Sequence, residues 1–150
     1  MASPADVEAI TALYAQGGWR PTSRSWQQLG ERIARGEVAV IREGGQVVAS
    51  VAVTWEDAEC WGAGGGDAAA GYVHALVRDR DRTSPGVGSR LLAWAEARIA
   101  AMGRPLARLD TRSSSARLIR YYEAHGYRPV GSATIPGHTT LTLFEKRLPR

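Results

Sequence analysis

The sequence lacks several features that mark particular classes of protein. Cys60 is the single cysteine among 150 residues, which excludes an internal disulfide and a cysteine-based metal cluster. No hydrophobic run approaches the roughly 20 residues that a membrane span needs. The first residues show neither the basic nor the apolar region of a signal peptide. We therefore expect a cytoplasmic protein with no membrane partner.

Lysine is almost absent, so arginine carries the positive charge. Lys146 is the only lysine, yet the formal net charge is +4 and the pI is about 9.7. No lysine or arginine lies between Arg42 and Arg78, where the acidic residues are Glu43, Glu56, Asp57, Glu59 and Asp67. A basic pI alone fits a nucleic-acid binder, but no basic and aromatic strand motif or recognition-helix pattern accompanies it. We therefore expect no nucleic-acid partner, and a middle segment that attracts cations.

Length and periodicity predict one domain, residues 1–150, in which helices and strands alternate. Caps and apolar spacings of three and four residues predict helices over 3–17, 23–35, 89–102 and 113–125. Apolar runs predict strands over 38–42, 47–55, 72–78, 106–111, 127–130 and 139–146. The glycine-rich residues 56–71 are expected to form a long mobile loop.

The order strand, helix, strand from Tyr72 to Thr111 predicts a parallel strand pair, because a crossover helix joins parallel neighbours. The remaining strands follow one another as antiparallel neighbours would. The sequence therefore predicts an α/β (α+β) fold with a mixed sheet. Ligands are expected at the carboxyl ends of the parallel strands.

A glycine-containing turn follows the first of these two strands. Gly86 and Gly88 have no Cβ, so backbone amides between Thr83 and Ser89 can approach a ligand closely. The helix that follows adds free N–H groups and the positive end of its dipole, which favours an anion such as a phosphate. Four arginines bracket the turn: Arg78, Arg80, Arg82 and Arg90. The turn is the place where we expect the chemistry.

Two motifs resemble those of a known family. One is the strand end Leu76-Val77 followed by the glycine turn, which is similar to a pyrophosphate turn of pattern [Arg/Gln]-x-x-Gly-x-[Gly/Ala]. The other runs from Ser115 to Tyr127 and is similar to an Asn-x-x-Ala-x-x-x-Tyr-x-x-x-Gly-Phe segment. With both motifs in this order, nearly the whole chain resembles the GNAT superfamily of acetyl-CoA-dependent N-acetyltransferases.

The chain departs from the family pattern at three points. Thr83 stands at the place of Arg or Gln, although Arg82 is adjacent, and Ser115 stands where Asn is common. The family opens with a strand ahead of the first helix, whereas this sequence starts at the helix cap, so either that strand is missing from the sequence or the sheet lacks that edge strand. We expect the motifs to be unaffected and the edge of the sheet to be less protected.

The resemblance implies a GNAT-like fold: a mostly antiparallel sheet with a central splayed parallel strand pair and about four helices. It implies acetyl-CoA as acyl donor, with no metal, and a small amine acceptor. The pyrophosphate would bind the turn and the pantetheine arm would pair with the strand end. The residues implied in cofactor binding are Leu76, Val77, Arg82, Thr83, Ser84, Pro85, Gly86, Val87, Gly88, Ser89 and Ser115.

The resemblance also implies the catalytic residues. Tyr122 would be the general acid that protonates the thiolate of coenzyme A; the structural alternative is an aromatic residue packed on the helix face. His74 is a candidate base on its own position: it lies two residues before Leu76, hence on the same face of the strand, and the unperturbed pKa of a histidine, about 6.5, suits the task. A pocket-lining or hydrogen-bonded histidine is the alternative. An acidic residue of the 56–71 segment or a water relay is the other candidate base.

The function expected is direct transfer of acetyl from acetyl-CoA to a primary amine in a ternary complex, because Cys60 is not placed as an acyl carrier. The acidic segment favours a small cationic acceptor. The alternative is a non-catalytic acyl-CoA-binding or sensing module of the same fold. His125 and His138 show no spacing for a metal site, and Asp110 is expected to be structural. The fold is also compatible with a homodimer.

Overall fold

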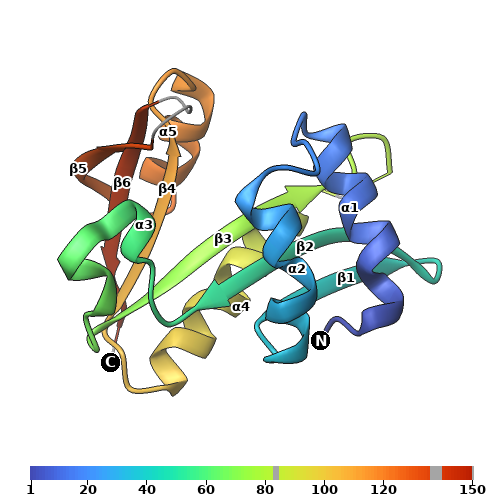
Figure 1. Cartoon of the computed structure of the whole chain (residues 1–150), viewed down its shortest axis with the longest axis horizontal. Coiled ribbons are helices and arrows are strands. Elements are labelled where there is room, and N and C mark those ends of the chain that lie inside the picture. The colour runs from blue at the N-terminus through green and yellow to red at the C-terminus, as the bar shows by residue number, and fades with distance from the viewer. Residues whose placement is uncertain (83–84, 136–139, 150) are drawn as a thin grey trace. The chain divides into compact units, whose positions relative to one another are not determined.

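The computed structural model describes residues 1–82, 85–135 and 140–149 (Figure 1). The α-helices are α1 (Val7–Gln16), α2 (Arg24–Ala34), α3 (Ala58–Trp61), α4 (Val87–Ala101) and α5 (Ala116–Ala124), with 3-10 helices η1 (Pro4–Asp6) and η2 (Gly62–Gly66). The strands are β1 (Val38–Glu43), β2 (Gln46–Thr54), β3 (Ala70–Arg78), β4 (Leu106–Arg112), β5 (Arg128–Thr134) and β6 (Thr140–Arg147). Within the described ranges, every helix is too short or too polar to span a bilayer.

The strands follow the order β1-β2-β3-β4-β6-β5. β3 and β4 are parallel and pair Ala70–Tyr72 with Leu106–Arg108, whereas the pairs β1/β2, β4/β6 and β5/β6 are antiparallel. The prediction of a mixed, mostly antiparallel sheet with one parallel pair is confirmed. The helix α4 joins the two parallel strands, as a crossover must.

The chain forms two compact units, and each is described by itself. The first contains residues 1–53 and 73–95. In this unit, α1 and α2 pack on the β1–β2 hairpin (Figure 1) through a core of Ile10, Tyr14, Leu29, Ile33, Val38 and Ala52. Ser3 and Asp6 start the first helical turn, where the amide of Ser3 donates to the Asp6 carboxylate at 2.9 Å. Arg42 of β1 contacts the same carboxylate at 2.8 Å and ties the turn to the hairpin.

The second unit contains residues 54–72 and 96–150. Its sheet of β4, β6 and β5 carries α5, and Phe144 of β6 is fully buried. Gly71 of β3 lies so close to α4 that a Cβ there would be 2.5 Å from Cγ1 of Ile99. Space therefore favours glycine at this position, because even one methyl group would overlap the side chain of Ile99.

Most expected elements are present, but one prediction is wrong. Residues 56–71 were expected to be a long mobile loop, whereas they contain α3 and η2. The carboxylate of Asp57 accepts from the amide of Cys60 at 3.3 Å and caps α3. The hydroxyl of Tyr72 donates to the carbonyl of Gly64 in η2 at 3.0 Å. Contacts with residues outside the segment thus order a stretch whose glycines alone predict a loop.

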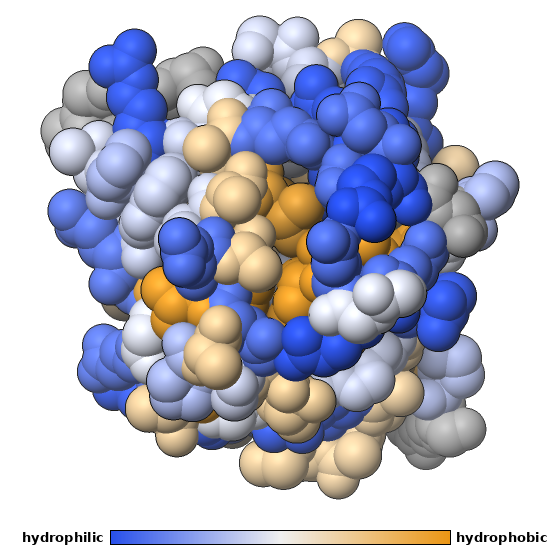
Figure 2. All heavy atoms as spheres, turned by 90° about the vertical axis from the view of Figure 1, so that its right-hand side faces the viewer, coloured by the Kyte–Doolittle hydropathy of each residue, from blue (hydrophilic) through white to orange (hydrophobic). Residues whose placement is uncertain are grey.

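The face of the molecule drawn in Figure 2 is mainly hydrophilic. A smaller group of hydrophobic residues lies near its middle. Among the described residues, the large hydrophobic side chains counted as exposed are Met1, Met102 and Val130. Single exposed apolar residues of this kind are normal for a folded protein.

Candidate functional site

The carboxyl end of β3 has an unusual backbone. Ala75 has φ of 54°, and it is the one described residue other than glycine with positive φ. This left-handed conformation costs an L-residue roughly 1–2 kcal/mol. It also interrupts the period-two alternation of the strand, so the two-residue spacing no longer places His74 and Leu76 on one face. Beyond it, the side chains of Leu76 and Val77 are only half-buried.

The glycine turn leads directly into α4. Gly86 has φ of 84°, and α4 begins at Val87, two residues earlier than expected. The carbonyl of Gly86 accepts from the amide of Arg90 at 3.0 Å, so the amides of Val87 and Gly88 belong to the first turn and have no acceptor within the helix. Gly88 therefore lies in the helix and not in the turn before it. Thr83 and Ser84, which the resemblance implies in cofactor binding, lie outside the described residues.

The segment between β3 and the turn is held by α1 and by the start of β2, in the same unit. The side chain of Gln16 accepts from the amide of Arg80 at 2.8 Å and donates to the carboxylate of Asp79 at 3.2 Å. A hydrogen bond from the amide of Asp81 holds the pKa of Asp79 below its usual range. Arg82 donates to the side chain of Gln46. The arginines that bracket the turn, Arg78, Arg80, Arg82 and Arg90, are all exposed.

His74 is buried on β3, with 7% of its surface exposed. Burial lowers its pKa well below the usual value of 6.5, and the positive charges of Arg32 and Arg24 lower it further. The imidazole is therefore neutral at pH 7. A neutral imidazole has one nitrogen that can accept a proton, as a general base must, but the lowered pKa makes this imidazole a weaker base than the sequence alone predicts.

Tyr122 lies on α5 in an aromatic cluster of the second unit. Its ring centroid is 6.0 Å from that of Tyr127 and 6.2 Å from that of Phe144. Burial, followed by the charges of Tyr121 and Asp110, raises the pKa of Tyr122 above its usual range. The phenol is therefore protonated at pH 7 and can donate a proton or a hydrogen bond.

Ser115 caps α5. Its hydroxyl accepts from the amide of Leu118 at 3.3 Å, which is the ordinary role of a serine at a helix N-cap. The cap aligns α5, and Tyr122 follows two turns later on the same helix. Ser115 thus has a local role in addition to the one that the resemblance implies.

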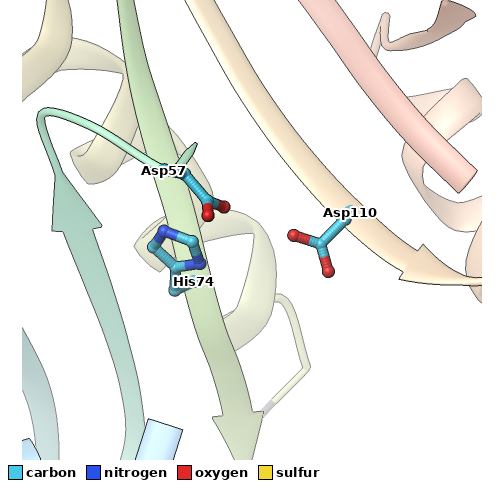
Figure 3. Close-up of side chains that lie close together, drawn as sticks. All are labelled: Asp57, His74 and Asp110. Atoms are coloured by element: carbon cyan, nitrogen blue, oxygen red, sulfur yellow. The ribbon is translucent and has the colours of Figure 1, made fainter. Parts of the chain in front are cut away.

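Two carboxylates of the second unit lie near each other. Asp57, at the N-cap of α3, is 6% exposed, and Asp110 lies half-buried on β4. One oxygen of each lies within 4.8 Å of the other, and the two groups face each other in Figure 3, which also draws His74 on β3. The sequence placed Asp57 only in an acidic loop and Asp110 at a strand end. Their proximity depends on α3, a helix in a stretch for which the sequence predicts a loop.

Comparisons with known proteins agree with this architecture. The model of the acetyltransferase (GNAT) family matches residues 8–127, which cover parts of both compact units. The uncharacterized N-acetyltransferase YesJ of Bacillus subtilis (strain 168) is 31% identical over an alignment of 121 residues that covers 77% of this chain. The chain spans about two thirds, 64%, of the length of that relative.

Solved structures share the fold at low sequence identity. An aminoglycoside 6'-N-acetyltransferase complexed with coenzyme A has a TM-score of 0.72 at 15% identity, covering 99% of this chain and 94% of its own. Ard1 from Thermoplasma volcanium has a TM-score of 0.79 at 14% identity, covering 99% and 95%. A GNAT-family acetyltransferase from Listeria monocytogenes 4b F2365 has a TM-score of 0.75 at 20% identity, covering 98% of this chain and 92% of its own. With the family model matching most of its length, this chain belongs to the acetyltransferase (GNAT) family.

Proposed function

We propose that the protein is an N-acetyltransferase that moves acetyl from acetyl-CoA to a primary amine of a small cationic molecule. Residues 1–150 would act as one N-acetyltransferase domain, in keeping with a family match that runs through both units. The observation that carries the proposal is the positive-φ Gly86 immediately before the 15-residue helix α4. A helix of this length, entered through a bend without a side chain, offers its first amides to an anion.

The cofactor under this proposal is acetyl-CoA, without a metal. Its pyrophosphate binds the amides of the turn and of the first turn of α4, with Arg82 nearby in sequence. The pantetheine arm pairs with the backbone of Leu76 and Val77, just beyond the irregular Ala75. The remaining residues proposed for the cofactor are Thr83, Ser84, Pro85, Gly86, Val87, Gly88, Ser89 and Ser115. Two structural neighbours were solved with coenzyme A, which supports this choice of ligand.

The chemistry is direct transfer within a ternary complex. The nitrogen of the neutral amine attacks the thioester carbonyl carbon, a C–N bond forms, and the C–S bond then breaks. The amine nitrogen gives up one proton to a base, and the thiolate of coenzyme A gains one from the phenol of Tyr122. The products are an amide and free coenzyme A, and Tyr122 regains its proton through solvent.

The base under this proposal is His74, acting directly or through water. Burial keeps the imidazole neutral, so it has a nitrogen that can accept the proton of the amine, but the lowered pKa makes it a weaker base than an ordinary histidine. An acidic side chain of the 56–71 segment is the other candidate. In either case, the acidic residues Glu56, Asp57 and Glu59 attract a cationic acceptor, because no lysine or arginine of that segment offsets them.

A non-catalytic acyl-CoA-binding module is the second candidate. The observation in its favour is the packing of Tyr122 among Tyr127 and Phe144, which gives the tyrosine a structural reason to be present. Such a module would bind acetyl-CoA without turnover.

The deciding experiment measures thiol release from acetyl-CoA across a panel of amines: polyamines, amino acid derivatives, aminoglycosides and peptides with a free N-terminus. A rise in melting temperature on adding acetyl-CoA serves as the control for binding. We expect both the rise and turnover, fastest with the cationic amines. A rise without turnover supports the binding module, and no rise contradicts acetyl-CoA as the ligand.

A further inference from the structure

Arg108 of β4 contacts the α3–η2 segment more extensively than an ordinary surface arginine would. Its Nη1 atom donates to the carbonyl of Gly64 at 3.1 Å and to the hydroxyl of Tyr72 at 3.0 Å. The same hydroxyl donates to the same carbonyl at 3.0 Å. The guanidinium also lies over the ring of Trp61, 4.6 Å from its centroid. One side chain thus contacts both α3 and η2.

The guanidinium is itself held in place. Its Nε atom donates to the carboxylate of Glu145 on β6 at 3.0 Å, and only 12% of the Arg108 side chain is exposed. Asp67, just after η2, lies 3.4 Å from Nη2. A planar guanidinium can satisfy all of these partners at once, whereas the ammonium of a lysine cannot reproduce the geometry.

The contacts continue from Gly64 to Asp57. Gly65 follows Gly64, and its carbonyl accepts from the amide of Asp57 at 2.8 Å. A Cβ at Gly65 would overlap the carbonyl of Asp57, so the two backbones are in direct contact. Arg108 thus contacts the carbonyl of Gly64, and Asp57 contacts the carbonyl of the next residue, Gly65. A shift of Arg108 is transmitted to the backbone that carries the Asp57 carboxylate.

We propose that Arg108 is a positioning residue for the acceptor amine, because it fixes η2 and, through it, the carboxylate of Asp57. The inference rests on the proposed function, in which the acidic segment attracts a cationic acceptor. Loss of Arg108 leaves the acetyl-CoA residues in place and moves Asp57. The effect therefore falls on the KM of the amine, and the KM of acetyl-CoA stays the same.

The experiment measures both KM values and kcat for the wild type, R108K, R108A and Y72F. Y72F removes the hydroxyl that links Arg108 to Gly64 and leaves the ring in place. R128A is the matched control, because Arg128 faces the same Glu145 at 3.9 Å, is 78% exposed and has no described contact with η2. Melting temperatures show whether each variant is folded.

We expect R108A to raise the amine KM roughly tenfold, with R108K and Y72F in between and R128A unchanged. The KM of acetyl-CoA should change less than about twofold in all four variants. If R108A does not fold, the amine KM values of R108K and Y72F test the inference in its place. An unchanged amine KM, or an equal rise in both KM values, overturns the inference. Failure of the wild type to acetylate any amine is a different result, because it contradicts the proposed function itself.

Discussion

At the scale of single residues, burial shifts the pKa of both proposed catalytic groups. Burial lowers the pKa of His74, so the imidazole is neutral at pH 7, and it raises the pKa of Tyr122, whose phenol is protonated at pH 7 even at its ordinary pKa. The imidazole can then accept a proton and the phenol can donate one. Neither direction follows from the sequence, because each depends on the side chains that surround the group in the folded chain.

Replacing Tyr122 by phenylalanine tests the general acid. The ring and its packing stay, but the proton donor is lost, so kcat should fall by roughly a hundredfold. The melting-temperature rise with acetyl-CoA should be unchanged. Y121F is the control, because it removes a hydroxyl from the adjacent tyrosine on the same helix. Equal kcat in Y122F and wild type would assign Tyr122 a packing role.

The depressed pKa of His74 predicts how stability depends on pH. The unfolded chain binds a proton at His74 below about pH 6.5, whereas the folded chain does not. The free energy of unfolding should therefore decrease as the pH falls below about 6.5. H74N should reduce this decrease between about pH 6.5 and 5 in urea denaturation curves. An unchanged pH dependence would show that the buried imidazole does not resist protonation.

At the scale of elements, two glycines are needed for different reasons. Gly86 is needed for its positive φ and not for space, because no atom of the described residues lies within 4 Å of where its Cβ would be. Gly71 has no unusual φ and is needed for space, since Ile99 of α4 occupies the place of a side chain. A substitution at Gly86 should therefore affect ligand binding, and one at Gly71 should affect stability.

G86A should weaken acetyl-CoA binding about tenfold, the equivalent of one hydrogen bond to a charged group. Strain in the left-handed region should also cost roughly 1 kcal/mol of stability. G36A is the matched control, because Gly36 has φ of 70° and equally open surroundings. Calorimetry and denaturation measure the two effects. If both variants lose acetyl-CoA affinity equally, the glycine turn has no special part in binding.

G71A should destabilise the protein by roughly 1–3 kcal/mol, because the new methyl group overlaps Ile99. Shortening the partner in the double variant G71A/I99V should recover part of the loss, and I99V alone sets the baseline. Denaturant midpoints measure each effect. A fully additive loss in the double variant would show that the two side chains do not compete for the same space.

At the scale of the whole molecule, local signals predicted the parts of the fold that local interactions determine. The strand, glycine turn and α4 could be predicted, because caps, glycines and apolar spacing lie within one stretch of sequence. The α3–η2 segment could not, because it is held by contacts from outside it: from Tyr72 and, 44 residues away from Gly64, from Arg108. The positive φ of Ala75 was missed for a similar reason: nothing in its local sequence calls for a left-handed alanine.

The most direct test compares the affinity for acetyl-CoA with that for S-acetylpantetheine, which carries the same thioester and pantetheine arm but lacks the diphosphate and the adenosine 3'-phosphate. If the first amides of α4 bind a pyrophosphate, calorimetry should find the full nucleotide bound at least about a hundredfold more tightly, the equivalent of two charge-assisted hydrogen bonds. Equal affinities for the two thioesters would contradict the account.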